Sequence, residues 1–79
     1  MSVLSYAQAK QLTLDRLKKV RDSMPYSERE MPRYVLGAPN AAKTETLSIL
    51  DLIRQVEMDT PLGRAYIYGD VQQLGYAVR

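Results

Sequence analysis

Few residues of this chain are able to do chemistry, because its 79 residues include neither cysteine nor histidine. Their absence excludes a thiol nucleophile, a Cys/His zinc site and a His-based catalytic triad. Two carboxylate pairs remain: Glu28 and Glu30 in a predicted loop, and Asp15 and Asp22 on an exposed helical face. Neither pair has a supporting base or metal ligand. We therefore predict a protein that is not an enzyme, with no metal or cofactor.

One segment has the pattern of a phosphate-binding loop. Residues 33–36 are apolar and β-prone, residues 37–44 read Gly-Ala-Pro-Asn-Ala-Ala-Lys-Thr, and a predicted helix follows. Backbone N–H groups of such a loop can surround a phosphate. Gly37, Lys43 and Thr44 occupy the positions at which a loop of this kind needs a glycine, a cation and a hydroxyl.

This segment resembles the Walker A loop of P-loop nucleotidases, G-x-x-x-x-G-K-[ST], over about ten positions. The resemblance implies that Lys43 reaches the phosphate oxygens and that Thr44 meets Mg²⁺. Ala42 departs from the pattern, where a second glycine would let the backbone approach the phosphate. Only 29 residues follow Leu50, too few for the parallel strands and crossover helices of a P-loop domain. We therefore predict a turn-rich connection here.

The hydrophobic pattern predicts one mainly α domain over residues 1–79, with a long N-terminal helix and two or three short C-terminal helices. The long helix covers residues 6–24, with Ser5 and Gln8 as its capping box and Pro25 after its end. One stripe on this helix is expected to be buried. It consists of Tyr6, Ala9, Thr13, Leu17, Val20 and Met24.

Two shorter helices are predicted in the C-terminal half. The first begins near Ile49 after the cap Ser48, although Thr44 is a competing start. Its expected buried stripe is Ile49, Leu52, Ile53 and Val56. The second begins at Pro61 after the cap Thr60 and stops at Gly69.

A β-hairpin is the alternative for the end of the chain. Residues 65–68, the pair Gly69-Asp70 and the residues from Val71 onward fit two strands joined by a tight turn. The alternative fold is then α+β, with strand 33–36 paired against this hairpin. Asp70 and Gln73 form a second capping pair, which favours the helix.

The tyrosine-rich segment at residues 64–68 is the strongest candidate for a working surface. Both of its faces are apolar in either conformation, and a chain this short buries only about 60% of its surface on folding. Tyrosine and arginine are typical anchors of protein interfaces. The predicted partner-binding residues are Arg64, Tyr66, Ile67, Tyr68 and Tyr76. Alternatively, the tyrosines fill the core of a chain that has no Phe or Trp.

Nucleic-acid binding is the alternative function. It would use the basic residues of the N-terminal helix, Lys10, Arg16, Lys18, Lys19 and Arg21. Asp15 and Asp22 lie three or four residues from Lys18 and Lys19, which favours a self-paired face over a phosphate-binding one. The two C-terminal helices can imitate a helix-turn-helix, but Arg64 is the only cation on the second.

Composition is that of an ordinary globular domain, with 46% hydrophobic and 25% charged residues. The net charge is +2, divided into +4 over residues 1–43 and −2 over residues 44–79. No apolar run approaches the roughly 18 residues of a membrane helix, and the first residues lack a signal-peptide pattern. We expect a cytoplasmic, non-catalytic interaction module, such as an assembly subunit, adaptor or inhibitor. Its partner would be another protein or a second copy.

Overall fold

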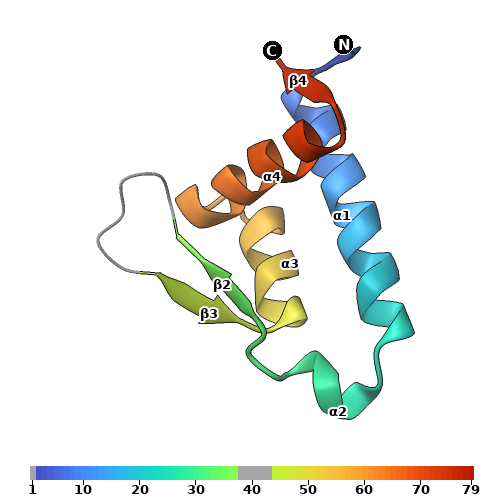
Figure 1. Cartoon of the computed structure of the whole chain (residues 1–79), viewed down its shortest axis with the longest axis vertical. Helices are drawn as coiled ribbons and strands as arrows, with labels where there is room; N and C mark the ends of the chain where they lie inside the picture. The colour runs from blue at the N-terminus through green and yellow to red at the C-terminus, as the bar shows by residue number, and fades with distance from the viewer. Residues whose placement is uncertain (1, 38–43) are drawn as a thin grey trace.

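The computed structural model of the chain describes residues 2–37 and 44–79. The fold is mainly α, as predicted: α1 (Tyr6–Ser23), α3 (Ile49–Glu57) and α4 (Pro61–Gln73) all pack against one another. A short helix, α2 (Tyr26–Arg29), follows α1. Figure 1 shows α4 crossing α3 and reaching α1. Most of the Walker-like loop, residues 38–43, lies outside the described residues.

Helix α1 begins as its sequence predicts. The Ser5 hydroxyl accepts a hydrogen bond from the backbone N–H of Gln8, and the Gln8 side chain accepts one from the N–H of Ser5. The helix ends at Ser23, one residue earlier than expected. Val20 is 42% exposed, so the predicted stripe is wrong at that residue, whereas Leu14, which the sequence places beside the stripe, is buried. Leu14 is buried because α1 packs against two helices rather than one.

Helix α3 matches its prediction. Ser48 caps it by accepting a hydrogen bond from the N–H of Asp51, and the four expected residues are all buried. The competing start at Thr44 is wrong, because Glu45–Leu47 forms strand β3.

Helix α4 runs continuously from Pro61 to Gln73, so the hairpin alternative is wrong. Ile67 and Val71 lie one turn apart on the same face of this helix and are both fully buried. Gly69 is therefore inside the helix, and Asp70 does not start a new one. The helix ends instead before Gly75, whose positive φ of 92° is the left-handed conformation that glycine adopts most readily.

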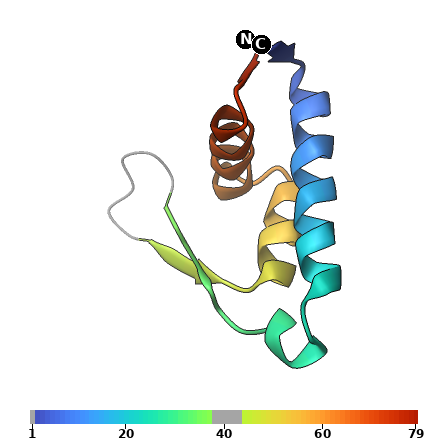
Figure 2. The ribbon, with the colours of Figure 1, turned by 45° about the vertical axis from the view of Figure 1, so that its right-hand side comes forward.

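Four three-residue strands lie in the part of the chain that the structure describes. Strand β2 (Tyr34–Leu36) was expected, but its antiparallel partner is β3 and not a C-terminal hairpin. The parallel pair of β1 (Ser2–Leu4) and β4 (Tyr76–Val78) was not predicted. This pair brings the two ends of the chain side by side (Figures 1 and 2). Within the described residues, no helix is long and apolar enough to span a membrane.

The core lies where the three long helices meet, and no tyrosine is fully buried in it. Its members are Ala9, Leu14, Leu17, Ile49, Leu52, Ile53, Val56, Ile67 and Val71. The tyrosines lie around this core at half-buried or exposed positions. The suggestion that tyrosines serve as the large core residues is therefore confirmed in part: Tyr6, Tyr34, Tyr66 and Tyr76 pack against the core, although none of them is fully buried.

Candidate functional site

Helix α4 presents three faces, because successive helical side chains point about 100° apart. Gly63, Ile67 and Val71 are buried against the core. Tyr66 lies to one side of this face and Tyr68 to the other. The two tyrosines therefore lie on different sides of α4, and Ile67 between them is the residue that faces the core.

The exposed side of α4 meets the first turn of α1 in a cluster of three side chains. We call Tyr6, Arg64 and Tyr68 the tyrosine patch. The ring centroids of Tyr6 and Tyr68 are 6.0 Å apart at an interplanar angle of 38°, and the Arg64 guanidinium carbon lies 5.6 Å from the Tyr6 centroid. Tyr68 remains 48% exposed. These distances are typical of tilted aromatic pairs and of cation–π contacts.

Asp59 fixes the position of Tyr6. The Tyr6 hydroxyl donates a 2.6 Å hydrogen bond to Oδ1 of Asp59, and the Lys10 ammonium donates one of 2.7 Å to Oδ2. Lys10 also donates to the carbonyl oxygen of Glu57. Short bonds to a carboxylate are stronger than neutral ones. The patch is therefore held in place from two helices and from the turn between α3 and α4.

Asp59 has an unusual backbone conformation in that turn. Its φ is +55°, and Asp is one of the few residues with a side chain that tolerates this region. The hydrogen bonds from Lys10 and then from Tyr6 lower the pKa of Asp59. Burial and the bond to Asp59 raise the pKa of Tyr6, with Arg64 acting in the opposite direction. Asp59 is therefore anionic, and Tyr6 neutral, over a wide range of pH.

Replacing Asp59 by asparagine is expected to lower stability at neutral pH and to leave it unchanged at strongly acidic pH. The folded pKa of Asp59 is below its unfolded value near 3.8. Stability from its hydrogen bonds is thus present above the unfolded pKa and is lost as pH falls through the folded pKa. Asparagine also tolerates the positive φ, so the turn itself is retained.

Urea denaturation followed by circular dichroism, at neutral and at strongly acidic pH, measures this difference. Lys10→Met should also lose more stability at neutral than at strongly acidic pH, because it removes the other charge of the pair, and its bond to the carbonyl oxygen of Glu57 is lost at both pH values. An equal loss of stability at both pH values would contradict the role assigned to the carboxylate.

The predicted partner-binding residues do not form one surface. Arg64 and Tyr68 lie together in the tyrosine patch, whereas Tyr66 is half-buried on another face of α4. Tyr76 belongs to β4 and packs against the core. Ile67 is 0% exposed, so its assignment to the partner surface is corrected: it is a core residue.

Sequence reasoning missed the part of the site that comes from the N-terminal half. Tyr6 was expected in the core, and Lys10 was considered only as a contact to nucleic acid. Their partner Asp59 is about fifty residues away in the chain, so no local pattern connects them. The only local signal was an acidic residue directly before the Thr60-Pro61 helix start.

The basic residues of α1 are dispersed rather than gathered into one phosphate-binding face. Arg21 pairs with Asp22 at 3.0 Å, and Arg16 lies 3.9 Å from Asp70. The expected pairing of Lys18 and Lys19 with Asp15 and Asp22 is wrong: within residues 2–37 and 44–79 neither lysine forms an ion pair.

The α3–α4 pair has the order of a helix-turn-helix but the wrong charge for DNA. Residues 49–73 include four acidic and two basic residues, a net charge of −2. A helix that enters the major groove approaches a dense row of phosphates, which favours a basic surface.

The fold and the site define a small, mainly helical domain with an exposed tyrosine and arginine surface. No protein-family model matches the chain, and comparisons with curated proteins and with solved structures gave no match.

Proposed function

We propose that the chain is a non-catalytic protein-interaction module that binds its partner through the tyrosine patch. The observation that supports this most is Tyr68, a large aromatic side chain that stays 48% exposed while it packs against Tyr6. The fully buried core residues do not include it. Roles such as an assembly subunit, an adaptor or an inhibitor are consistent with this arrangement.

The patch has the properties of an interface anchor. Tyr and Arg are enriched among the residues that contribute most to protein binding. Binding costs less free energy when the anchoring side chains are already ordered. Here Asp59 orders Tyr6, and Tyr6 in turn contacts both Tyr68 and Arg64. The partner would be another protein or a second copy of this chain.

Tyr68→Ala is expected to weaken association by about 10- to 100-fold, the range of a central anchor residue. The matched control is Tyr26→Ala in α2. Tyr26 is 84% exposed and also stacks with an arginine, with the Arg29 guanidinium carbon 4.2 Å from its centroid. It lacks the second ring and the carboxylate that hold Tyr6, so this control should retain association.

Light scattering over a range of protein concentrations measures self-association of the wild type and both variants. Affinity purification from the cells that make the protein compares what each variant retains, and binding to a purified candidate partner then gives the dissociation constants. Equal behaviour of the two alanine variants would contradict the proposal. So would a wild type that stays monomeric and retains no protein.

Nucleic-acid binding remains the alternative, and the two unpaired lysines of α1 are the observation in its favour. A mass increase when nucleic acid is added at low salt, abolished by Lys18→Glu with Lys19→Glu, would replace the proposal by this function. Nucleic-acid binding is the second candidate because the α3–α4 pair is acidic.

A further inference from the structure

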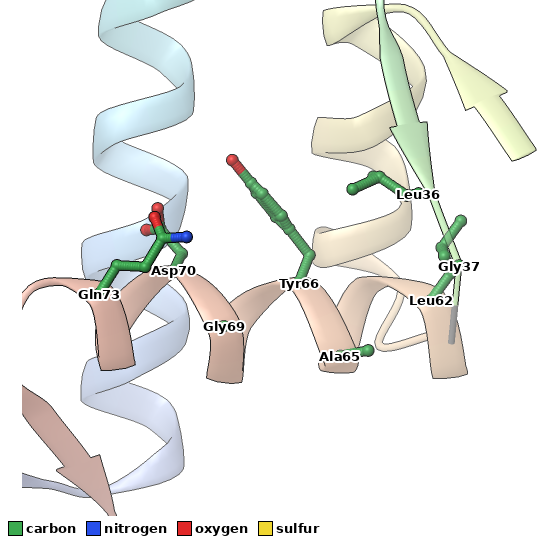
Figure 3. A pocket seen from close by; sticks show the side chains of 8 residues that line it. All are labelled: Leu36, Gly37, Leu62, Ala65, Tyr66, Gly69, Asp70 and Gln73. Atoms are coloured by element: carbon green, nitrogen blue, oxygen red, sulfur yellow. The ribbon is translucent and has the colours of Figure 1, made fainter. Parts of the chain in front are cut away.

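A cavity of about 320 Å³ lies between α4 and the end of β2. Its volume is within the range of small-ligand sites, roughly 300–1,000 Å³. Figure 3 shows Leu36 and Leu62 at one end, Tyr66 in the middle, and Asp70 and Gln73 at the other end. The cavity therefore has an apolar end and a polar end, and Asp70 is the one charged residue among the described residues that line it.

The carboxylate of Asp70 has weak partners for a group that is nearly buried. Its side chain is only 11% exposed. The Thr13 hydroxyl donates to Oδ2 at 3.3 Å, and the Arg16 guanidinium is 3.9 Å from Oδ1, beyond hydrogen-bond distance. Charge-assisted bonds to a carboxylate are normally about 2.7–2.9 Å. No residue in the described part of the chain donates a hydrogen bond to Oδ1.

Oδ1 of Asp70 is still accessible from outside the protein. Within residues 2–37 and 44–79, no fully buried side-chain oxygen lacks a hydrogen-bond partner. Since Oδ1 has no such partner there, it must keep some contact with solvent, and Asp70 lines the cavity. A donor inside the cavity would therefore find a carboxylate oxygen that has no hydrogen-bond partner among the described residues.

We infer that this cavity binds a small organic cation, a primary ammonium joined to an apolar or aromatic body. The ammonium would donate to Oδ1 of Asp70 and to the side-chain carbonyl of Gln73. The apolar body would pack against Leu36, Leu62 and the ring of Tyr66. An anion is disfavoured, because among the described lining residues the one charged side chain, Asp70, is acidic. The inference does not depend on the proposed function, because the tyrosine patch lies on a different face of α4.

Two residues next to Asp70, Tyr66 and Arg16, affect the binding site. Burial, followed by the charge of Asp70, raises the pKa of Tyr66, so its phenol stays neutral at physiological pH. Arg16 interacts only weakly with Asp70, because the Arg16 side chain is 45% exposed and its guanidinium nitrogen lies 3.9 Å from Oδ1 of Asp70. A ligand ammonium at hydrogen-bond distance would replace this long ion pair.

Phenethylamine and its neutral analogue 2-phenylethanol are suitable probes, because they differ in the ammonium alone. Titration of isotope-labelled protein, followed by the amide shifts of Gly69, Asp70 and Gln73, measures both affinities. The amine should saturate these shifts and bind at least about 10-fold more tightly than the alcohol. Asp70→Asn should remove this preference and leave the binding of the alcohol unchanged.

Two further variants test the site in opposite directions. A Cβ at Gly69 would meet no atom within 4 Å, so Gly69→Leu can place its side chain in the cavity and should abolish binding of both probes. Arg16→Ala removes the competing cation and should strengthen amine binding. Circular dichroism confirms that each variant is folded, and these two carry the test if Asp70→Asn does not fold.

Equal affinity for the amine and the alcohol would overturn the inference of a cation site. Shifts confined to the tyrosine patch, or no shifts at any lining amide, would overturn the assignment of the cavity. Weaker amine binding in Arg16→Ala would also contradict it, because Arg16 would then help to hold the ligand.

Discussion

Replacement of Gly63 by alanine is expected to destabilise the fold strongly. Gly63 lies in the first turn of α4, where the helix passes against the backbone of α3. An added Cβ would overlap the carbonyl group of Gln55 and lie 2.8 Å from the amide nitrogen of Val56, much closer than van der Waals contact. These are backbone atoms of a helix, so they cannot move aside as a flexible side chain would. The two helices would have to separate.

Overpacking in a rigid site costs about 1–3 kcal/mol and occasionally more, and a backbone contact belongs to the upper part of that range. A chain of this length has a stability of about 4–12 kcal/mol in total. We therefore expect Gly63→Ala to lower the free energy of unfolding by roughly 3 kcal/mol or more. Urea denaturation followed by circular dichroism measures it.

Gly69→Ala is the matched control, because it is the same change in the same helix. Gly69 has open space at its Cβ position and is inside α4. Alanine there should stabilise the protein by about 0.5–1 kcal/mol through its higher helix propensity. If the two variants had equal stability, the close approach of α3 and α4 would not be the feature that Gly63 permits.

The same contact positions the candidate site. Gly63 allows α4 to start directly beside the end of α3, and the turn between them contains Asp59. Arg64 follows Gly63 and points to the exposed side, toward Tyr6. The geometry of the tyrosine patch therefore depends on a glycine that contacts neither ring.

Helix starts were predictable from the sequence because a cap needs only its near neighbours. Ser5, Ser48 and Thr60 each accept a hydrogen bond from an N–H three residues later, as their spacing indicated. The buried stripe of α3 was predictable for the same reason, since nine residues with a regular apolar period suffice to define it.

Features that join distant segments were not predictable. The parallel pairing of β1 with β4 depends on strands of three residues, too short for an alternating pattern, at opposite ends of the chain. The hydrogen bond from Tyr6 to Asp59 was not predictable for a similar reason, because the two residues are far apart in the chain. Gly69 was predicted to end the helix from its residue type alone. Burial of Ile67 and Val71 instead stabilises a helix that continues beyond Gly69.

Ile67→Ala tests whether, within residues 64–68, Ile67 belongs to the core and Tyr68 to the surface. Ile67 is 0% exposed and belongs to the core cluster, whereas its neighbour Tyr68 is 48% exposed. Removing a buried isoleucine side chain to Cβ costs about 2–5 kcal/mol, because transfer energy is lost and a cavity remains. We expect Ile67→Ala to lower the free energy of unfolding by that amount.

Denaturant unfolding of Ile67→Ala and Tyr68→Ala, combined with association measurements, separates the two roles. Tyr68→Ala should change stability by less than about 1 kcal/mol and weaken association. Ile67→Val, which removes one methyl group, should lose about 0.5–1.5 kcal/mol and keep association intact. An Ile67→Ala protein with wild-type stability and weakened association would place this side chain on the partner surface after all. The face that α4 turns toward α1 and α3 would then be assigned incorrectly.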